Sequence, residues 1–236
     1  MSNSILKRIN NCLRLGLGAI PQSCVLCAAL GCRDGLCRAC NSSLTTIAYT
    51  HCPRCALPTD GNLCGACLKT PPEFDSVTAA FIYAFPTDAL IQSLKYHANL
   101  AITCVLAEKL IEAAPGSVGA DFFLPVPLAR EKQRERGFNQ AHEIAKILGR
   151  YYGVPVEANL CGRVRNTFSQ TSLPWSERTK NIRGAFSCTH DLTGKKIILV
   201  DDVLTTGATL NELAKTLRKQ GAAEIRAWVV VRTLPM

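Results

Sequence analysis

The sequence has few charged residues, few large aromatic residues and no long apolar run. Charged side chains make up 19% of its 236 residues and apolar ones 47%. This balance excludes a wholly disordered chain and predicts one or two domains with a substantial core. No apolar stretch approaches the roughly 18–20 residues of a transmembrane helix. Two tryptophans and five tyrosines leave few rings on which nucleic-acid bases could stack.

Several common signatures of sites and signals are also missing. The loop after residue 200 has neither the Gly-Lys-Ser/Thr of a Walker A loop nor the three spaced glycines of a dinucleotide-binding turn. No Ser-His-Asp or Cys-His pattern indicates a nucleophilic enzyme, so His97, His142 and His190 are expected to be ordinary surface or cap residues. The apolar stretch 15–20 is shorter than the core of a secretory signal, so we expect a cytoplasmic protein.

The N-terminal residues 1–20 are expected to form a separate helical segment. Residues 4–14 place Ile5, Ile9 and Leu13 on one side of a short amphipathic helix. Two interpretations are open at this point. The helix packs on the body of the protein, or it lies at a membrane surface and associates the protein peripherally with it.

The net charge of +9 favours anionic partners such as phosphates, nucleic acid or an acidic membrane surface. The positive charge is concentrated in two segments. Residues 1–70 hold seven Lys/Arg and two Asp/Glu, and residues 130–183 hold eleven and five. These two segments are the expected places for contact with such a partner.

Ten of the thirteen cysteines fall within residues 1–70, and eight of them form four Cys-x2-Cys pairs. Two such pairs complete the tetrahedral thiolate shell that zinc prefers, so residues 21–70 are predicted to be a double zinc-binding module. Local pairing closes the shorter loops. The predicted ligands are therefore Cys24, Cys27, Cys37 and Cys40 in one unit and Cys52, Cys55, Cys64 and Cys67 in the other.

Other interpretations of the cysteine module remain open. Disulfides and an iron–sulfur site also use paired cysteines. Cys32 is an additional candidate ligand, and His51 is a weaker one because it only adjoins Cys52. Four thiolates leave no open position on zinc, so we expect a structural role for the metal and no metal catalysis here.

Residues 73–236 are predicted to be an α/β domain, a mostly parallel sheet with helices on both faces. Strands and helices alternate along this part of the chain. Expected strands are 77–85, 122–126, 196–200 and 224–232; expected helices lie within 87–113, at 137–151 and at 208–219; and 163–184 is polar and irregular.

The most informative segment is 197–209. An apolar strand is followed by Asp201 and Asp202, then by a loop of hydroxyls and glycine, and then by a helix. Backbone N–H groups at a helix N-terminus, with threonine hydroxyls beside them, form a site for a phosphate. Paired carboxylates suit the vicinal hydroxyls of a ribose or a magnesium-bound sugar. The segment therefore predicts a ribose 5-phosphate site, whereas a threonine-rich helix cap is the simpler alternative.

Residues 200–209 resemble the phosphoribosyl-pyrophosphate (PRPP) signature of type I phosphoribosyltransferases. The chain as a whole resembles the ComF family, competence-associated proteins in which a double zinc ribbon precedes such a domain. The resemblance spans roughly residues 21–232. It also rests on residues 94–96, 124–128, 136–140 and 163–165, and on Thr167, Gln170, Arg178, Asn181, Gly184 and Phe186.

The resemblance implies a role for each matching position. Asp201 and Asp202 would be the catalytic acids that hold the ribose hydroxyls, and residues 163–184 would be a mobile loop that closes over the site. The turn after strand 122–126 would contact pyrophosphate. For Lys95 and Arg136, pyrophosphate binding and an ordinary exposed charge are equally open. The remaining implied substrate-binding residues are Val126, Pro127, Leu128, Val203, Leu204, Thr205, Thr206, Gly207, Ala208, Thr209, Arg163 and Arg165.

Two functions follow from these expectations. The first is a Mg²⁺-dependent enzyme that uses PRPP, as a transferase or a pyrophosphohydrolase, with structural zinc and an unidentified acceptor. The second is a non-catalytic competence protein that senses PRPP or binds single-stranded DNA. In either case the resemblance implies a place in DNA uptake and natural transformation, alongside competence proteins such as a helicase.

Overall fold

A computed structural model describes residues 23–32, 34–47, 50–96, 100–165 and 182–235. The segments 1–22 and 166–181 lie outside these residues. The expected N-terminal helix and most of the expected mobile loop therefore cannot be placed. None of the helices in the described ranges is long and apolar enough to cross a membrane.

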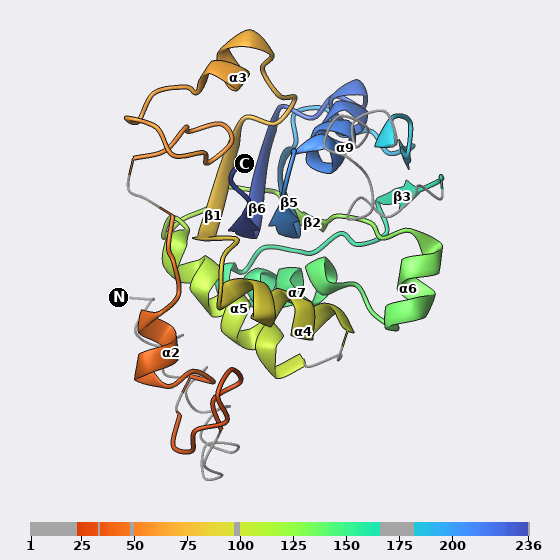
Figure 1. Cartoon of the computed structure of the whole chain (residues 1–236). Coiled ribbons are helices and arrows are strands. Elements are labelled where there is room, and N and C mark those ends of the chain that lie inside the picture. Colours follow the sequence, from red (N-terminus) through yellow and green to blue (C-terminus); the bar gives the residue numbers. More distant parts are fainter. Residues whose placement is uncertain (1–22, 33, 48–49, 97–99, 166–181, 236) are drawn as a thin grey trace.

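The larger part of the chain is built on a sheet of four parallel strands in the order β1-β6-β5-β2 (Figure 1). Their bounds are Ser76–Ile82 for β1, Phe122–Pro125 for β2, Lys196–Leu204 for β5 and Glu224–Arg232 for β6. Burial on both faces explains their continuous apolar runs, since neither face of such a sheet meets water. The parallel α/β class expected from the sequence is confirmed.

Helices cover both faces of this sheet (Figure 1). The apolar sides of α4 (Thr87–Tyr96), α5 (Leu100–Ala113) and α7 (Gln140–Tyr152) pack with Ile198, Val200 and Trp228. The apolar side of α9 (Ala208–Lys219) packs with Ile197 and Leu199. Consecutive residues of a strand point to opposite faces, so β5 contributes alternately to the two cores. We call these the α5 face and the α9 face.

Three local features differ from the sequence expectation. A separate short helix, α6 (Arg130–Arg136), ends at Gly137, whose φ of 77° is left-handed. Strands β3 (Cys161–Arg163) and β4 (Phe186–Cys188) pair antiparallel as a two-stranded hairpin, at the two ends of the stretch expected to be irregular. Strand β5 continues through both acids to Leu204, because β6 remains paired beside it up to Arg232.

The two cysteine units contact different faces of the sheet. The first unit carries the short helix α2 (Arg38–Ser42), and its Leu36 belongs to the core of the α5 face. Gly35 lies so close to α5 that a Cβ added there would be 2.6 Å from a methyl group of Val105. The second unit carries α3 (Gly65–Lys69), and its Ala56 belongs to the core of the α9 face.

Candidate functional site

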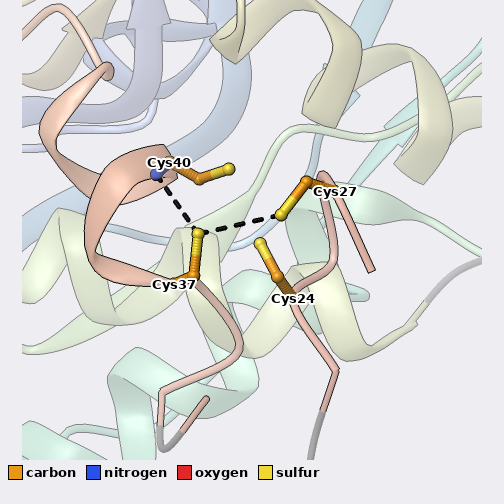
Figure 2. Close-up of side chains that lie close together, drawn as sticks. All are labelled: Cys24, Cys27, Cys37 and Cys40. Carbon is orange, nitrogen blue, oxygen red and sulfur yellow. Dashed lines mark hydrogen bonds between the residues drawn. The ribbon is translucent and has the colours of Figure 1, made fainter. Parts of the chain in front are cut away.

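The first four-cysteine unit brings its four sulfur atoms into one cluster (Figure 2). Ligand atoms of Cys24, Cys27, Cys37 and Cys40 all lie within 4.8 Å of one another. The Sγ atoms of Cys27 and Cys37 are 3.7 Å apart, and the Cys40 amide donates to Cys37 Sγ at 3.4 Å. Figure 2 shows all four side chains pointing toward a common centre.

The second unit repeats this arrangement with Cys52, Cys55, Cys64 and Cys67, whose ligand atoms also lie within 4.8 Å of one another. Zinc–sulfur bonds of about 2.3 Å in a tetrahedron place the sulfur atoms about 3.8 Å apart. The observed 3.5 Å between Cys55 and Cys64 Sγ is close to that value. Both units therefore fit a four-thiolate zinc ion, and the local pairing of cysteines is the one that the structure has.

The turn between the first two cysteines has the same backbone geometry in both units. The Ala28 amide donates to Cys24 O at 2.8 Å, and the Ala56 amide donates to Cys52 O at 2.9 Å. Both alanines have a left-handed φ, 59° and 57°. The repeat seen in the sequence is thus a repeated metal-binding turn.

Backbone amides also favour ionised thiols in both units. Burial acts to raise the pKa of Cys24 and of Cys52, but hydrogen bonds from backbone N–H groups outweigh it and lower each pKa to about 6. For Cys55, burial dominates and raises the pKa to about 11. One thiolate in each unit is therefore available at neutral pH as the first ligand of a cation.

The loop between β5 and α9 surrounds a small pocket at the carboxyl end of β5. This pocket is lined by Asp201, Val203, Leu204, Thr205, Gly207, Ala208, Thr209 and Leu210. Gly207 has a φ of 80°, and the Thr206 hydroxyl accepts the Ala208 amide at 3.1 Å. The N-terminus of the twelve-residue helix α9 provides positive potential toward this pocket. An anion of phosphate size is the ligand that such a loop suits.

The two adjacent acids of β5 lie close together but have different further neighbours. Asp201 lines the pocket of the loop, and its Oδ1 accepts the Asp202 amide at 2.9 Å. The Oδ2 atom of Asp202 is 2.9 Å from Lys95 Nζ of α4. Asp201 is therefore the acid that borders a ligand held in the loop.

Burial and charge separate the pKa values of the two acids. Burial raises the pKa of Asp201 well above its usual range, and the negative charge of Asp202 adds to the rise. Burial also acts to raise the pKa of Asp202, but the Lys95 ammonium outweighs it and the pKa falls. Burial opposes the charge on Lys95 as well, and Asp202 reverses that effect so that the Lys95 pKa rises. Asp202 and Lys95 thus form an ion pair beside Asp201, whose pKa is raised.

Arg136 at the end of α6 adds a second cation on the Asp202 side. Its guanidinium lies 5.7 Å from the centre of the Tyr96 ring and donates to Gln140 Oε1 at 3.2 Å. Its charge contributes to the lowered pKa of Asp202. Lys95 and Arg136 are therefore members of one charged cluster at the carboxyl edge of the sheet.

A larger pocket of about 850 Å³ adjoins the turn after β2. The Val126 amide donates to Val200 O at 2.9 Å, which fixes this turn beside β5, and Asn139 Nδ2 donates to Val126 O at 3.0 Å. Pro127, Leu128 and Arg163 line the pocket. Arg165 instead donates to Arg183 O at 2.6 Å across the hairpin. The expected pyrophosphate turn and Arg163 thus lie together, whereas Arg165 has a structural contact.

Two family models match separate parts of the chain. A double zinc ribbon domain matches residues 18–68, and a phosphoribosyl transferase domain matches residues 134–234. Competence protein F of Haemophilus influenzae is 34% identical over 211 residues, which are 85% of this chain and 91% of that protein. DNA utilization protein YhgH of Escherichia coli strain K12 is 34% identical over 226 residues, 91% of this chain and 99% of that protein.

The chain belongs to the ComF family. The competence protein ComFC of Streptococcus pneumoniae is 28% identical over 199 residues, 84% of this chain and 87% of that protein. Among solved structures, the purine phosphoribosyltransferase from Pyrococcus horikoshii matches with 21% identity and a TM-score of 0.31, over 67% of this chain and 88% of that one. The resemblance drawn from the sequence motifs is confirmed.

Sequence reasoning missed two residues at the loop of this ComF-family protein. Arg232 ends β6 and is 4% exposed, with its guanidinium directed to the carbonyls of Leu204 and Thr205. The Phe74 ring lies 3.8 Å from the position of a Cβ added to Gly207. A cation directly after the apolar run 227–231 was the available signal for Arg232. Nothing in the sequence around Phe74 indicated its place.

Proposed function

We propose that this ComF-family protein binds PRPP with Mg²⁺ at the loop from Leu204 to Thr209 and transfers the phosphoribosyl group to an acceptor during DNA uptake. The chain is a competence and DNA-utilization protein with a phosphoribosyltransferase-type domain. One observation carries the finer proposal. A hydroxyl-lined loop opens helix α9 beside Asp201, at the carboxyl edge where parallel sheets bind their ligands.

In this proposal the residues of the loop bind the 5′-phosphate through backbone amides and threonine hydroxyls. Asp201 then accepts hydrogen bonds from the ribose hydroxyls, because its carboxyl lines the same pocket. Asp202 holds Lys95 in place at 2.9 Å and keeps that cation at the site. Lys95 and Arg136 attract the pyrophosphate group, and Arg163 beside the turn after β2 adds to that field.

The chemistry needs positioning and charge stabilisation more than a nucleophilic side chain. The bond between C1 of the ribose and a pyrophosphate oxygen breaks, and pyrophosphate leaves with the electron pair. A nitrogen of the acceptor forms the new bond to C1 and loses its proton to solvent. Mg²⁺ bound to the pyrophosphate would neutralise charge on the leaving group, and carboxylate oxygen from Asp201 is the donor type that it prefers.

Calorimetric titration of PRPP with and without Mg²⁺ tests the binding step. We expect magnesium-dependent affinity in the wild-type protein and at least a tenfold loss in Asp201→Asn. Thr216→Ser, near the C-terminal end of α9, keeps the hydroxyl that donates to Glu212 O and is a control that should bind normally. A wild-type protein without affinity for PRPP would refute the proposal. Release of pyrophosphate in the presence of nucleobases, nucleotides or DNA then tests transfer and identifies the acceptor.

A second function, binding of single-stranded DNA without catalysis, is favoured by the charge of α6. This seven-residue helix carries Arg130, Lys132, Arg134 and Arg136 against two glutamates. Affinity for a labelled single strand should fall steeply with salt, because basic side chains release counterions when they bind phosphates. Rescue of transformation by Asp201→Asn in a strain that lacks the protein would favour this function over transfer.

A further inference from the structure

Arg232 is a buried cation between the second cysteine unit and the phosphate-type loop. Only 4% of Arg232 is exposed to solvent. Nε donates to Cys55 O at 2.9 Å, and Nη1 donates to Leu204 O at 3.1 Å, to Thr205 O and to Thr233 O at 2.7 Å. One guanidinium therefore holds a backbone carbonyl of a zinc-ligand residue and two carbonyls of the loop.

The guanidinium makes this connection rigid. Its donors are fixed in one plane, so a displacement of Cys55 moves the plane that also orients Leu204 and Thr205. A lysine has one rotating ammonium and cannot keep the same directions to both segments. The carbonyls involved need donors because buried oxygen atoms without a partner are costly.

Charge supports the same connection. A buried guanidinium is unfavourable without an opposite charge nearby. A zinc ion with four thiolates carries a net charge of about −2, the sum of one divalent cation and four anions. Burial lowers the pKa of Arg232, and the nearby Cys55, Cys64 and Cys67 act against that effect. A filled second unit is thus an opposite charge beside the buried guanidinium.

Apolar packing gives a parallel contact between the same two regions. Ala56, directly after Cys55, is fully buried in the core that also contains Leu204 and Ala208. Phe74 follows the second unit and lies under Gly207 of the loop. The Glu73 amide donates to Asn211 Oδ1 of α9 at 2.7 Å. The first unit instead packs against α5, on the opposite face.

We propose that Arg232 is a positioning residue through which zinc in the second cysteine unit sets the conformation of the loop from Leu204 to Thr209, and with it the affinity for a sugar phosphate. The part that concerns affinity rests on the proposed function. The part that concerns the loop conformation does not, since it follows from the carbonyls that Arg232 binds.

Four full-length proteins test this proposal: wild type, Arg232→Lys, Cys64→Ser and the double variant. Cys37→Ser is the matched comparison, since Cys37 holds the equivalent third position in the first unit. Hydrogen exchange of amides 204–208 reports the loop without any ligand. Calorimetric titration with PRPP and Mg²⁺ reports the affinity. Zinc content, circular dichroism and exchange in the central strands verify that each variant folds.

We expect Cys64→Ser and Arg232→Lys each to speed hydrogen exchange of the amides 204–208 at least tenfold. Each should also lower the affinity for PRPP at least tenfold. The double variant should be no worse than either single one, because both remove the same connection. Cys37→Ser should change both quantities less than twofold. A merely structural Arg232 would instead give additive losses and faster exchange throughout the sheet.

The outcomes separate this proposal from the proposed function. If wild type does not bind PRPP, the proposed function fails, and the exchange data alone decide the coupling. If wild type binds PRPP but Cys64→Ser binds equally well, the coupling is refuted, whatever the exchange data show. Equal effects of Cys37→Ser and Cys64→Ser would also refute it, because the loss would then be general and not specific to the Arg232 contact.

Discussion

The two faces of the sheet carry similar parts that are connected differently. Each face has one four-cysteine unit. On the α5 face, Lys95 of α4 is paired with Asp202, and the first unit packs against Val105 of α5. On the α9 face, the second unit is connected through Arg232 to the loop, whose pocket is lined by Asp201. The repeated sequence motif therefore serves two different surroundings.

The two adjacent acids of β5 also differ in their nearest partners. Asp202 is paired with Lys95 at 2.9 Å, whereas Asp201 lines the loop pocket and accepts the Asp202 amide at 2.9 Å. The Lys95 ammonium acts on both carboxyl groups, but it outweighs burial only at Asp202, so the pKa of Asp202 falls while that of Asp201 rises. One acid thus borders the ligand pocket while the other fixes a cation.

Removal of one zinc ligand from each unit should give the largest effect. Because the two units share no ligand, Cys37→Ser and Cys64→Ser should each lower the zinc content from two ions per chain to one. Structural zinc contributes on the order of 10 kcal/mol to the folding of its own small unit. Inductively coupled plasma mass spectrometry on dialysed protein measures the zinc content.

Cys104→Ser is the control for these variants, because Cys104 is an exposed cysteine on α5 outside both clusters. It should retain both zinc ions. Loss of both ions from either ligand variant would show that the units do not load independently, and the comparison of the two faces would then lose its basis.

The two acids should respond to the same substitution with different changes in stability. Asp202→Asn leaves Lys95 without its partner in a mostly buried site, which should lower the free energy of unfolding by about 2–3 kcal/mol. Asp201→Asn removes a carboxyl whose ionisation is unfavourable, so the cost should be below about 0.5 kcal/mol at pH 7. Urea unfolding in magnesium-free buffer measures both values.

The pH dependence of these variants should differ in sign. The raised pKa of Asp201 means that wild type gains stability from this group as pH falls through its folded-state pKa, and Asp201→Asn removes that gain. The lowered pKa of Asp202 contributes stability above the unfolded value of about 3.9, which is lost as pH falls through the folded value. The double variant Lys95→Met, Asp202→Asn should recover most of the free energy of unfolding that Asp202→Asn alone loses.

Sequence periodicity predicted most of the fold, because the parallel strands are buried and their apolar runs are continuous. The expected strand 196–200 ended before the two acids, because charged residues usually mark the end of a buried strand. Pairing with β6 instead extends β5 to Leu204. The hairpin of Cys161 and Cys188 is three residues on each side, too short for a periodic pattern. The cysteine spacing predicted both metal units, because local spacing alone determines which sulfurs meet.

The contacts of the candidate site were less predictable than its residues. The loop residues lie along one continuous segment, so their proximity followed from the sequence. Arg232 reaches Cys55 across 177 positions of the chain, and Lys95 reaches Asp202 from a different helix. Such contacts depend on strand order and on which face each side chain occupies, and neither can be read from a single motif.

The smallest expected effect comes from the left-handed alanines after Cys27 and Cys55. A left-handed φ costs a residue with a Cβ about 1 kcal/mol, which glycine avoids. Ala28 is exposed, so Ala28→Gly should stabilise the first unit by most of that amount. Ala56 is fully buried, and loss of its methyl group costs about 0.8 kcal/mol. Ala56→Gly should therefore leave stability almost unchanged.

Competition with a chromogenic zinc chelator measures this difference, because a more stable turn releases its zinc at a higher chelator concentration. Ala29→Gly, next to Ala28 but outside the left-handed positions, controls for added chain flexibility and should not increase zinc retention. If Ala28→Gly and Ala56→Gly increased zinc retention equally, the burial of Ala56 against the α9 face would contribute nothing to the stability of the second unit. The apolar contact between that unit and the loop would then be too weak to distinguish the second unit from the first. Arg232 alone would have to connect the second unit to the loop.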